Sequence, residues 1–423
     1  MVKLKVKNFG PINDGFTEND GFMDISQITL FCGNQATGKS TIAKLFSTLT
    51  WLEKAVFRND YDEVAVSNKE FFVNFLKNQR IHEYLKDNSE IIYIGNAYIF
   101  SYENNDFSVS VNEEKLKYYI RPKIMYIPAE RNLLTILEDA DKIQKLPVML
   151  SILLERYRNA RKKLAQKIYG LPISNIKIKY DSINNITTVF SENNQEVDIS
   201  NSSSGIQSVT PLSLVTDYLA NTLTQDVFSN IQKLSVAERD KIKHDIQEFE
   251  DKELSDILLK ELNMYFLAGT KQGISEKNVY LMMKVLQYYF NQCFINIVEE
   301  PEQNLFPQSQ NKVLYHLLKC LNKNPNNQLI ITTHSPYIIS FLTLCAKGYE
   351  LKSKGVDLNK INTIVPIESI VSGQSITIYE TNEDGRIELL KPYETLPSDD
   401  NLLNKLMAEQ NNLFTKLLEI EEE

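Results

Sequence analysis

The chain has 423 residues, of which 43% are hydrophobic, and a formal net charge of −9. This length allows two or three structural units with sizeable cores, and the composition excludes a disordered chain. No apolar run approaches the ~18 residues that a membrane span needs, so we expect no membrane association and a cytoplasmic location. The acidic total argues against nucleic-acid binding over a broad surface and leaves room only for a local basic patch.

Four cysteines, Cys32, Cys293, Cys320 and Cys345, show no paired metal-ligand spacing along the sequence. Two of them flank or enter apolar strands, which is typical of reduced residues in a core. The sequence therefore suggests neither a zinc site nor a disulfide framework.

An apolar run at residues 28–32 is typical of a buried strand, and residues 40–46 have helical spacing. Between them, Gly33-Asn34-Gln35-Ala36-Thr37-Gly38-Lys39-Ser40-Thr41 completes the pattern G-x-x-x-x-G-K-[ST]. A loop in this place meets a helix N-terminus, where backbone N–H groups and the helix dipole converge on anions. We expect ATP to bind these nine residues, and residues 1–50 to begin an ATPase core.

The residue types of this loop fit a nucleoside triphosphate. Gly33 and Gly38 let the backbone wrap around the phosphates, and Lys39 neutralises the β- and γ-phosphate oxygens. The Ser40 hydroxyl is placed to coordinate the Mg²⁺ that accompanies the nucleotide.

The next segments alternate between helix and strand patterns. Residues 51–90 suit short amphipathic helices, which predicts a helical insertion. Residues 91–132 are predicted to return to the core with an antiparallel subsheet, because Gly95-Asn96 is a hairpin signal between two apolar runs. Residues 133–210 are predicted to form a helical lobe that opens with a long helix, to about residue 168, and then holds a second hairpin.

The second half of the chain completes the core. Residues 211–292 are mostly helical in pattern, with dense mixed charge in the middle, and predict a second helical insertion. Residues 293–395 hold apolar strands with a helix between them, as the C-terminal part of the core should. Residues 396–423 predict a C-terminal helix starting at Ser398, with leucines along one side. The expected fold class is α/β, with a mixed core sheet.

Two acids, Glu299 and Glu300, follow the apolar strand at residues 294–298. In a phosphate-loop ATPase, one acid at this place holds Mg²⁺ and the next polarises the attacking water. We therefore assign Glu299, with Ser40, to the metal and Glu300 to catalysis. His334 follows the next buried strand, at the sheet edge where ligands bind, and is predicted to contact the γ-phosphate as a second catalytic residue.

In this order the motifs resemble the ATPase heads shared by ABC transporters, SMC and RecF proteins, and OLD-type bacterial ATPases. The segments at residues 6–12, 126–131 and 299–307 look like the OLD branch in particular. The resemblance implies an ABC-type head that forms a head-to-tail homodimer, in which the signature of one subunit covers the γ-phosphate held by the other. By its place in the chain, that signature consists of Ser203, Ser204, Gly205 and Gln207.

The chain departs from the family pattern at several positions. Glu299 stands where the metal-binding residue is usually Asp, and Phe306 replaces an aspartate of transporter heads. The junction between the core and the helical lobe, around residues 129–131, lacks the Gln that family members usually have there. Glu130 and Arg131 are the candidates to replace the contact that this Gln makes. There is no long heptad array, and residues 335–423 show no carboxylate cluster of the kind that holds nuclease metals, so we expect no nuclease domain.

Three functions are weighed against these observations. The resemblance implies a dimeric ATPase, or a higher oligomer of dimers, that controls a separate nuclease or toxin effector, as in Septu- or PARIS-type antiphage systems. A RecF- or SMC-like ATPase that binds DNA is the alternative, and an ABC transporter subunit fits less well because the stretch between signature and acid pair is long. The DNA-binding reading would use a basic cluster on the lobe helix: Arg156, Arg158, Arg161, Lys162, Lys163 and Lys167.

Overall fold

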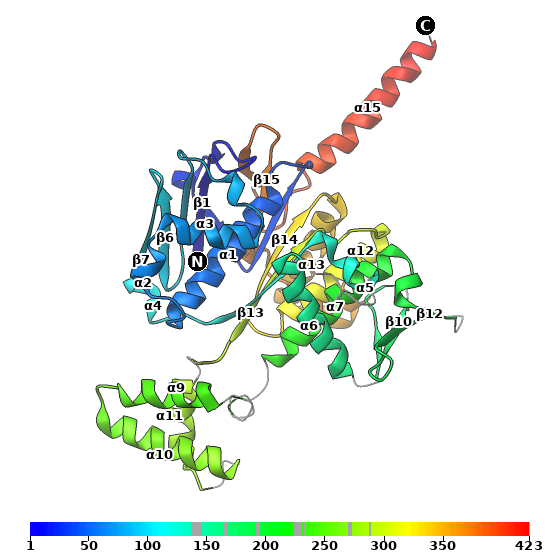
Figure 1. The fold of residues 1–423 in the computed structure, drawn as a ribbon. Coiled ribbons are helices and arrows are strands. Elements are labelled where there is room, and N and C mark those ends of the chain that lie inside the picture. Colours follow the sequence, from blue (N-terminus) through cyan, green and yellow to red (C-terminus); the bar gives the residue numbers. More distant parts are fainter. Residues whose placement is uncertain are drawn as a thin grey trace.

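The computed structural model describes residues 1–422 except for residues 137–145, 165–166, 174, 192–194, 224–230, 232–233, 235, 270–272 and 287–288. A mixed sheet with the strand order β2-β16-β15-β4-β14-β13-β8 lies at its centre (Figure 1). The neighbours from β15 to β8 run parallel, while β16 is antiparallel to β15. The bounds are β2 Gly15–Phe16, β4 Ile28–Gly33, β8 Pro122–Ile127, β13 Cys293–Glu299, β14 Gln328–Thr333, β15 Ile376–Thr381 and β16 Arg386–Leu389.

Side chains of the central strands point alternately to the two faces of this sheet, as the period of a strand requires. In β4, Leu30 and Cys32 pack into one hydrophobic cluster and Phe31 packs into the other. In β14, Ile331 packs into the same cluster as Leu30, and Ile330 packs into the same cluster as Phe31. Because both faces are buried, such strands read as unbroken apolar runs in the sequence.

One face carries α1 Lys39–Phe57 and an antiparallel sheet with the order β3-β1-β5-β6-β7. The hairpin predicted at Gly95-Asn96 is confirmed, since it joins β5 to β6. The predicted boundary at residue 50 falls inside α1, because the buried side of that helix continues to Val56. The other elements here are β1 Val2–Lys7, β3 Met23–Ile25, β5 Glu90–Ile94, β6 Tyr98–Glu103, β7 Asp106–Val111, α2 Glu63–Val66, α3 Lys69–Asn78 and α4 Glu113–Leu116.

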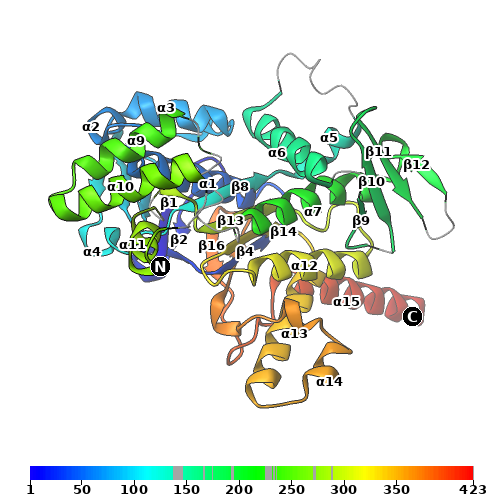
Figure 2. The same ribbon diagram turned by 90° about the horizontal axis from the view of Figure 1, so that it is seen from below.

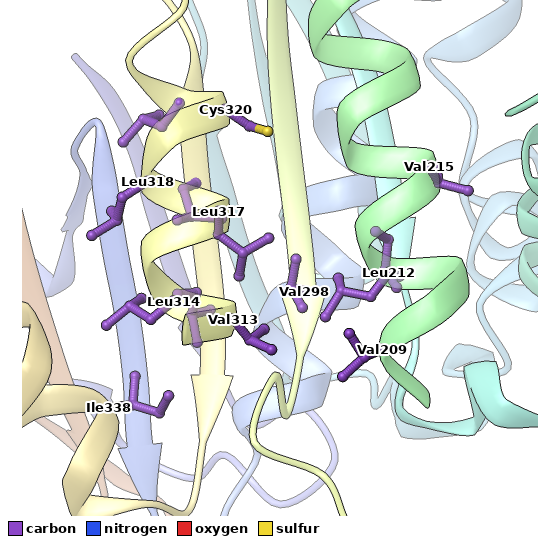
Figure 3. Packing of buried hydrophobic residues seen from close by; sticks show 14 of the residues in the cluster. Val209, Leu212, Val215, Val298, Val313, Leu314, Leu317, Leu318, Cys320 and Ile338 are labelled. Atoms are coloured by element: carbon purple, nitrogen blue, oxygen red, sulfur yellow. The ribbon is translucent and has the colours of Figure 1, made fainter. Parts of the chain in front are cut away.

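The opposite face carries α6 Val148–Leu164, α7 Ser204–Thr222, α12 Pro307–Leu321 and α13 Pro336–Ser353. Beyond α13, α14 Leu358–Asn362 stands out from the body (Figure 2). Figure 3 shows Val298 of β13 between side chains of α7 and α12, and the cluster includes Val209, Leu212, Val313 and Leu317. Each such burial stabilises the fold by ~1.5–3 kcal/mol.

The predicted helical lobe contains more strand than its pattern indicated. After α5 Leu133–Ile136 and α6 comes an antiparallel sheet with the order β12-β11-β10-β9. The second hairpin is confirmed, with Asn184-Asn185 between β10 and β11. The predicted end of the long helix near residue 168 is wrong, because α6 ends at Leu164 and β9 is too short to show an alternating pattern. The strand bounds are β9 Ile168–Gly170, β10 Lys177–Asp181, β11 Ile186–Phe190 and β12 Glu196–Asp198.

The second insertion forms a small helical body below the core (Figure 1). It consists of α9 Val236–Gln247, α10 Lys252–Ala268 and α11 Glu276–Leu286, which share a hydrophobic cluster of their own. Nζ of Lys241 donates to the carbonyl of Arg58, at 2.9 Å, and so connects this body to the end of α1.

The C-terminal helix α15 Leu402–Glu422 extends away from the rest of the molecule (Figure 1). It begins after Asn401, whose Oδ1 accepts a hydrogen bond from the N–H of Asn404 as an N-cap does, and not at Ser398. Leu403 is buried, whereas Leu413 and Leu417 are 60% and 63% exposed. The leucine side of this helix is therefore open along most of its length.

The expected fold class is confirmed: the chain is α/β, with a mixed core sheet, an antiparallel subsheet, a helical lobe and helical insertions. Within the described residues, every helix is too short or too polar to span a membrane. All four cysteines lie in the described part of the chain and are buried as free thiols.

Candidate nucleotide-binding site

Three predicted motifs meet at the carboxyl edge of the central sheet. β4 ends at the phosphate loop, β14 beside it ends before His334, and β13 beside β14 ends at Glu299. The strand register places Thr332 opposite both Phe31 and Glu299. Because the three strands are parallel, motifs that are far apart in the chain reach the same edge, which is where ligands bind in α/β sheets.

The phosphate loop has a conformation that requires its two glycines. Gly33 has a φ of 144° and Gly38, the N-cap of α1, has a φ of 100°. Both lie in a region that residues with a Cβ avoid. A Cβ on Gly33 would also lie 2.3 Å from the carbonyl oxygen of Thr381, and the hydroxyls of Thr37 and Thr381 share a hydrogen bond of 2.5 Å. The loop is thus held against β15 and opens toward the first N–H groups of α1.

Lys39 is buried at the start of α1 and turns back over the loop. Its Nζ donates to the carbonyl oxygens of Gly33, at 3.0 Å, and Asn34, at 2.5 Å. Burial lowers the pKa of Lys39 to about 8, against the opposing effect of the Glu300 carboxylate. Phosphate oxygens are charged acceptors and therefore stronger partners for this ammonium group than the two carbonyls are.

Glu300 and His334, the two predicted catalytic residues, lie side by side. Nε2 of His334 is 3.3 Å from Oε1 of Glu300, and this hydrogen bond lowers the pKa of the Glu300 carboxyl. Glu300 has a φ of 42°, which is strained for a residue with a side chain. The strain is held in place because its N–H donates to Thr332 and its carbonyl accepts from Arg131, at 2.9 and 2.7 Å.

Glu299 is buried, and both of its carboxylate oxygens have protein partners. Oε1 accepts from the Tyr126 hydroxyl, and Oε2 accepts from the N–H of Ala129 at 3.1 Å. A carboxylate oxygen keeps a second lone pair, and Mg²⁺ retains several waters in protein sites. With the Ser40 hydroxyl as another oxygen donor, the residues present fit Mg²⁺, with Glu299 holding it through water.

Arg131 is fully buried and connects the acid pair to the signature helix. Its guanidinium donates to the carbonyls of Glu299 and Glu300, each at 2.7 Å, and to that of Ser208 in α7, at 3.2 Å. Burial lowers the pKa of Arg131 to about 10, so it stays charged at neutral pH. Arg131 therefore acts on the site through these carbonyls. The exposed Glu130 remains the candidate to replace the contact that a Gln makes at this junction in the family.

Glu302 was not predicted as a site residue, yet it fixes the position of His334. Its Oε1 accepts from the Thr333 hydroxyl at 2.6 Å and from the N–H of His334 at 2.7 Å, and burial raises its pKa. The signal in the sequence is its place in the run Glu299-Glu300-Pro301-Glu302, where a third acid follows the predicted pair.

Of the four predicted signature residues, two are exposed to solvent and two are buried and pack against neighbouring backbone. Ser203 and Ser204 are exposed at the N-terminus of α7. Gly205 is buried, and a Cβ there would lie 2.7 Å from the carbonyl of Asn304. The Gln207 amide donates to the carbonyls of Ile199 and Ser200, so its side chain supports the preceding turn. The two serines are therefore the side chains that a ligand or a second subunit can reach.

The predicted basic cluster does not form one open face. Arg161 lies over the rings of Tyr157 and Tyr180, at 4.7 and 4.8 Å, and Arg156 lies beside Glu155. The remaining cluster residues Lys162, Lys163 and Lys167 are exposed, and Arg158 is half-buried.

Comparison with known proteins supports part of this assignment. A family model described as "AAA ATPase domain" matches residues 215–339, which include the acid pair and His334 but not the phosphate loop. The search of curated proteins found no match. Together with the phosphate loop and the acid pair at the edge of the mixed core sheet, this match over part of the chain supports an ATP-hydrolysing enzyme in general terms.

The solved structures that match this chain are distant from it. The SMC head domain from Thermotoga maritima is 8% identical over 92% of this chain and 98% of its own, with a TM-score of 0.36. An Smc head domain from Pyrococcus furiosus, bound to the C-terminal domain of ScpA, is 9% identical over 98% and 100%, with a TM-score of 0.34. The cbiO1 component of an ABC transporter from Clostridium perfringens is 12% identical over 91% and 86%, with a TM-score of 0.27. At these identities and TM-scores the likenesses carry no argument about the fold or the function of this chain.

Replacing Lys39 tests whether the loop binds nucleotide. Lys39→Ala removes the buried ammonium group, and a hydrogen bond to a charged group contributes about 1.5–3 kcal/mol, so ATP affinity should fall by at least about tenfold. Lys44→Ala, a half-buried lysine of the same helix, should leave affinity unchanged. Calorimetric titration with ATP measures both, and equal affinity of Lys39→Ala and the wild type would contradict the assignment.

Proposed function

We propose that this chain is a Mg²⁺-dependent ATPase that works as a head-to-tail homodimer and whose nucleotide state controls a separate effector protein in bacterial antiphage defence. The observation that carries the ATPase assignment is the convergence of Lys39, Glu299 and the Glu300–His334 pair on one edge of a parallel sheet. The defence role rests on the resemblance of the motifs to OLD-type ATPases.

Each residue of the edge has a part in hydrolysis. Lys39 and the first N–H groups of α1 hold the β- and γ-phosphates. Mg²⁺, held by Ser40 and through water by Glu299, would neutralise charge that develops on the phosphate oxygens. Glu300 is ionised at neutral pH and orients the attacking water, while His334 can donate from Nε2 to the γ-phosphate once it leaves Glu300.

The exposed start of α7 supports a composite site. Ser203 is the N-cap, yet within the described residues its side chain makes no capping hydrogen bond, so the first N–H groups of α7 are available to an anion. Phe306 is 71% exposed and lies two residues after Asn304, whose carbonyl lies close enough to Gly205 to exclude a Cβ there. A second copy of the chain would cover this aromatic side chain while α7 contacts the γ-phosphate.

The open side of α15 supports an interaction with an effector. Leu406, Leu413 and Leu417 are exposed along one side of a helix that leaves the body. The second insertion, α9 to α11, is the other candidate surface. DNA binding is the alternative function. Arg161 packs against two tyrosine rings, so fewer cations of the basic cluster are available to DNA than the sequence suggested.

Replacing Glu300 separates hydrolysis from binding. Glu300→Gln keeps the shape of the side chain and removes the charge that polarises water, so turnover should fall by about 10² or more while ATP affinity is retained. Glu388→Gln, on the exposed side of β16, is the control. Phosphate release and ATP titration measure the two effects, and wild-type turnover in Glu300→Gln would refute the catalytic role.

Mixing two inactive chains tests the composite site. Lys39→Ala disables the phosphate loop and Ser204→Arg blocks the signature, so each variant alone should hydrolyse little ATP. A mixed dimer would hold one intact pair, and the mixture should recover part of the wild-type rate. Absence of recovery in mixed dimers that are shown to form would indicate a site contained in one chain.

Charge placed on α15 tests the effector surface. Leu413→Glu with Leu417→Glu should abolish co-purification with the product of a neighbouring gene and leave ATP hydrolysis intact, because the helix stays but its apolar side is lost. Asn411→Glu with Thr415→Glu adds the same charge to the same exposed helix and should retain the partner. Equal partner recovery with both pairs would exclude the apolar side as the docking surface.

A further inference from the structure

A second cluster of ligand-type side chains lies between α7 and α12, away from the nucleotide edge. Asp217 of α7 and His316 and Cys320 of α12 place a carboxylate oxygen, an imidazole nitrogen and a sulfur within 4.8 Å of one another. Sγ of Cys320 is 3.3 Å from Oδ1 of Asp217, and Nε2 of His316 is 3.8 Å from Oδ2. His316 and Cys320 share a side of α12 because they are four residues apart. Figure 3 shows Cys320 on α12, with α7 opposite.

The imidazole of His316 has a buried nitrogen atom that no other described side chain satisfies, which indicates a missing ligand. Among the described residues, its buried Nε2 has no hydrogen-bond partner. A neutral imidazole is a common metal ligand, and one that binds at Nε2 would satisfy this buried atom.

The distances suit a small tetrahedral cation. Zn²⁺ lies ~2.3 Å from sulfur and ~2.0–2.2 Å from nitrogen or oxygen, so its ligand atoms are about 3.3–3.6 Å apart in a tetrahedron. The separation of 3.3 Å between Sγ of Cys320 and Oδ1 of Asp217 lies in this range, and the three ligand atoms of the cluster lie within 4.8 Å of one another. Sulfur and imidazole nitrogen select Zn²⁺ over Mg²⁺, which prefers oxygen alone.

Two neighbours of Asp217 affect metal binding: the Tyr169 hydroxyl would support it, and the Lys323 ammonium group would compete with the metal for the carboxylate. The Tyr169 hydroxyl donates to Oδ2 at 2.5 Å and can orient the carboxylate while it binds a metal. Nζ of Lys323 is 3.3 Å from Oδ1, and it also donates to Asn221 at 2.9 Å, a bond it can keep when a cation takes Oδ1. Metal binding requires the Cys320 thiolate, so it releases a proton and competes with the nearby ammonium group.

We propose that Asp217, His316 and Cys320 form a Zn²⁺ site. His316 also lines a cavity of about 1050 Å³ between α12 and the segment from β9 to the start of β10, and a water would be the fourth ligand. The site would fasten α7, which begins at the signature, to α12, which begins after the acid pair. Zn²⁺ would thereby fix the relative position of the two helices whose N-termini face the proposed dimer contact.

The test is metal binding by the nucleotide-free, full-length chain. After dialysis against micromolar Zn²⁺ with excess Mg²⁺, we expect one zinc per chain by elemental analysis and a raised thermal unfolding midpoint. With Co²⁺ in place of Zn²⁺, a thiolate-to-cobalt absorption band should appear in the near ultraviolet. Because the nucleotide edge has no cysteine other than the buried Cys32, this band reports on Cys320 and separates failure of this proposal from failure of the ATPase assignment.

Variants identify the ligands. Cys320→Ser should lose the cobalt band, and His316→Gln and Asp217→Asn should lower zinc binding by at least about tenfold, while far-ultraviolet circular dichroism shows that each variant is folded. Cys345→Ser, a buried cysteine of α13, should bind like the wild type and is the matched control. Absence of zinc in the wild type, or a cobalt band that persists in Cys320→Ser, would overturn the proposal.

Discussion

The buried guanidinium of Arg131 is the interaction on which the arrangement of the site depends. A charge without water is costly unless it is paired and hydrogen-bonded, and removing one partner of a buried charge typically costs about 3–5 kcal/mol. Here the charge is balanced by the carbonyls of Glu299, Glu300 and Ser208 and by nearby carboxylates. These bonds force the end of β13 and the first turns of α7 to keep one relative position.

In the proposed dimer, this constraint would connect the chemistry at the sheet edge to a second subunit. Glu300 has a strained backbone that Arg131 and Thr332 hold, and its side chain meets His334, which Glu302 fixes in turn. In the proposed mechanism, a change in the contacts of the γ-phosphate with this group would be passed to α7 through Arg131. In the proposed dimer, the exposed serines of α7 face the nucleotide of the other chain, so hydrolysis and dimer opening would be coupled.

The sequence predicted the parts of the site that depend on order along the chain. The run of residues 33–41 between a strand and a helix, the acids after β13 and His334 after β14 all follow from local pattern, and parallel strands bring them to one edge. Arg131 is a candidate for the missing Gln contact from the sequence, but its bonds to three backbone carbonyls could not be predicted, because such partners have no sequence signature. The Asp217–His316–Cys320 cluster escaped assignment because its members lie on two helices that are distant in the chain, and β9 because three residues are too few to show a strand period.

Two features outside the nucleotide edge have no place in hydrolysis itself. The body formed by α9 to α11 has a core of its own, and α15 leaves its leucines open to solvent. Burying such an apolar side is favourable by ~25 cal/mol per Å², which is why α15 is the surface proposed for an effector.

The central claim, a composite ATP site built from two chains, is tested most directly by a crystal structure of Glu300→Gln with Mg²⁺ and ATP. The account predicts a head-to-tail dimer in which the γ-phosphate contacts Lys39 of one chain and Ser204 and Gly205 of the other. ATP held at the phosphate loop of a monomer, with α7 of every chain open to solvent, would contradict it.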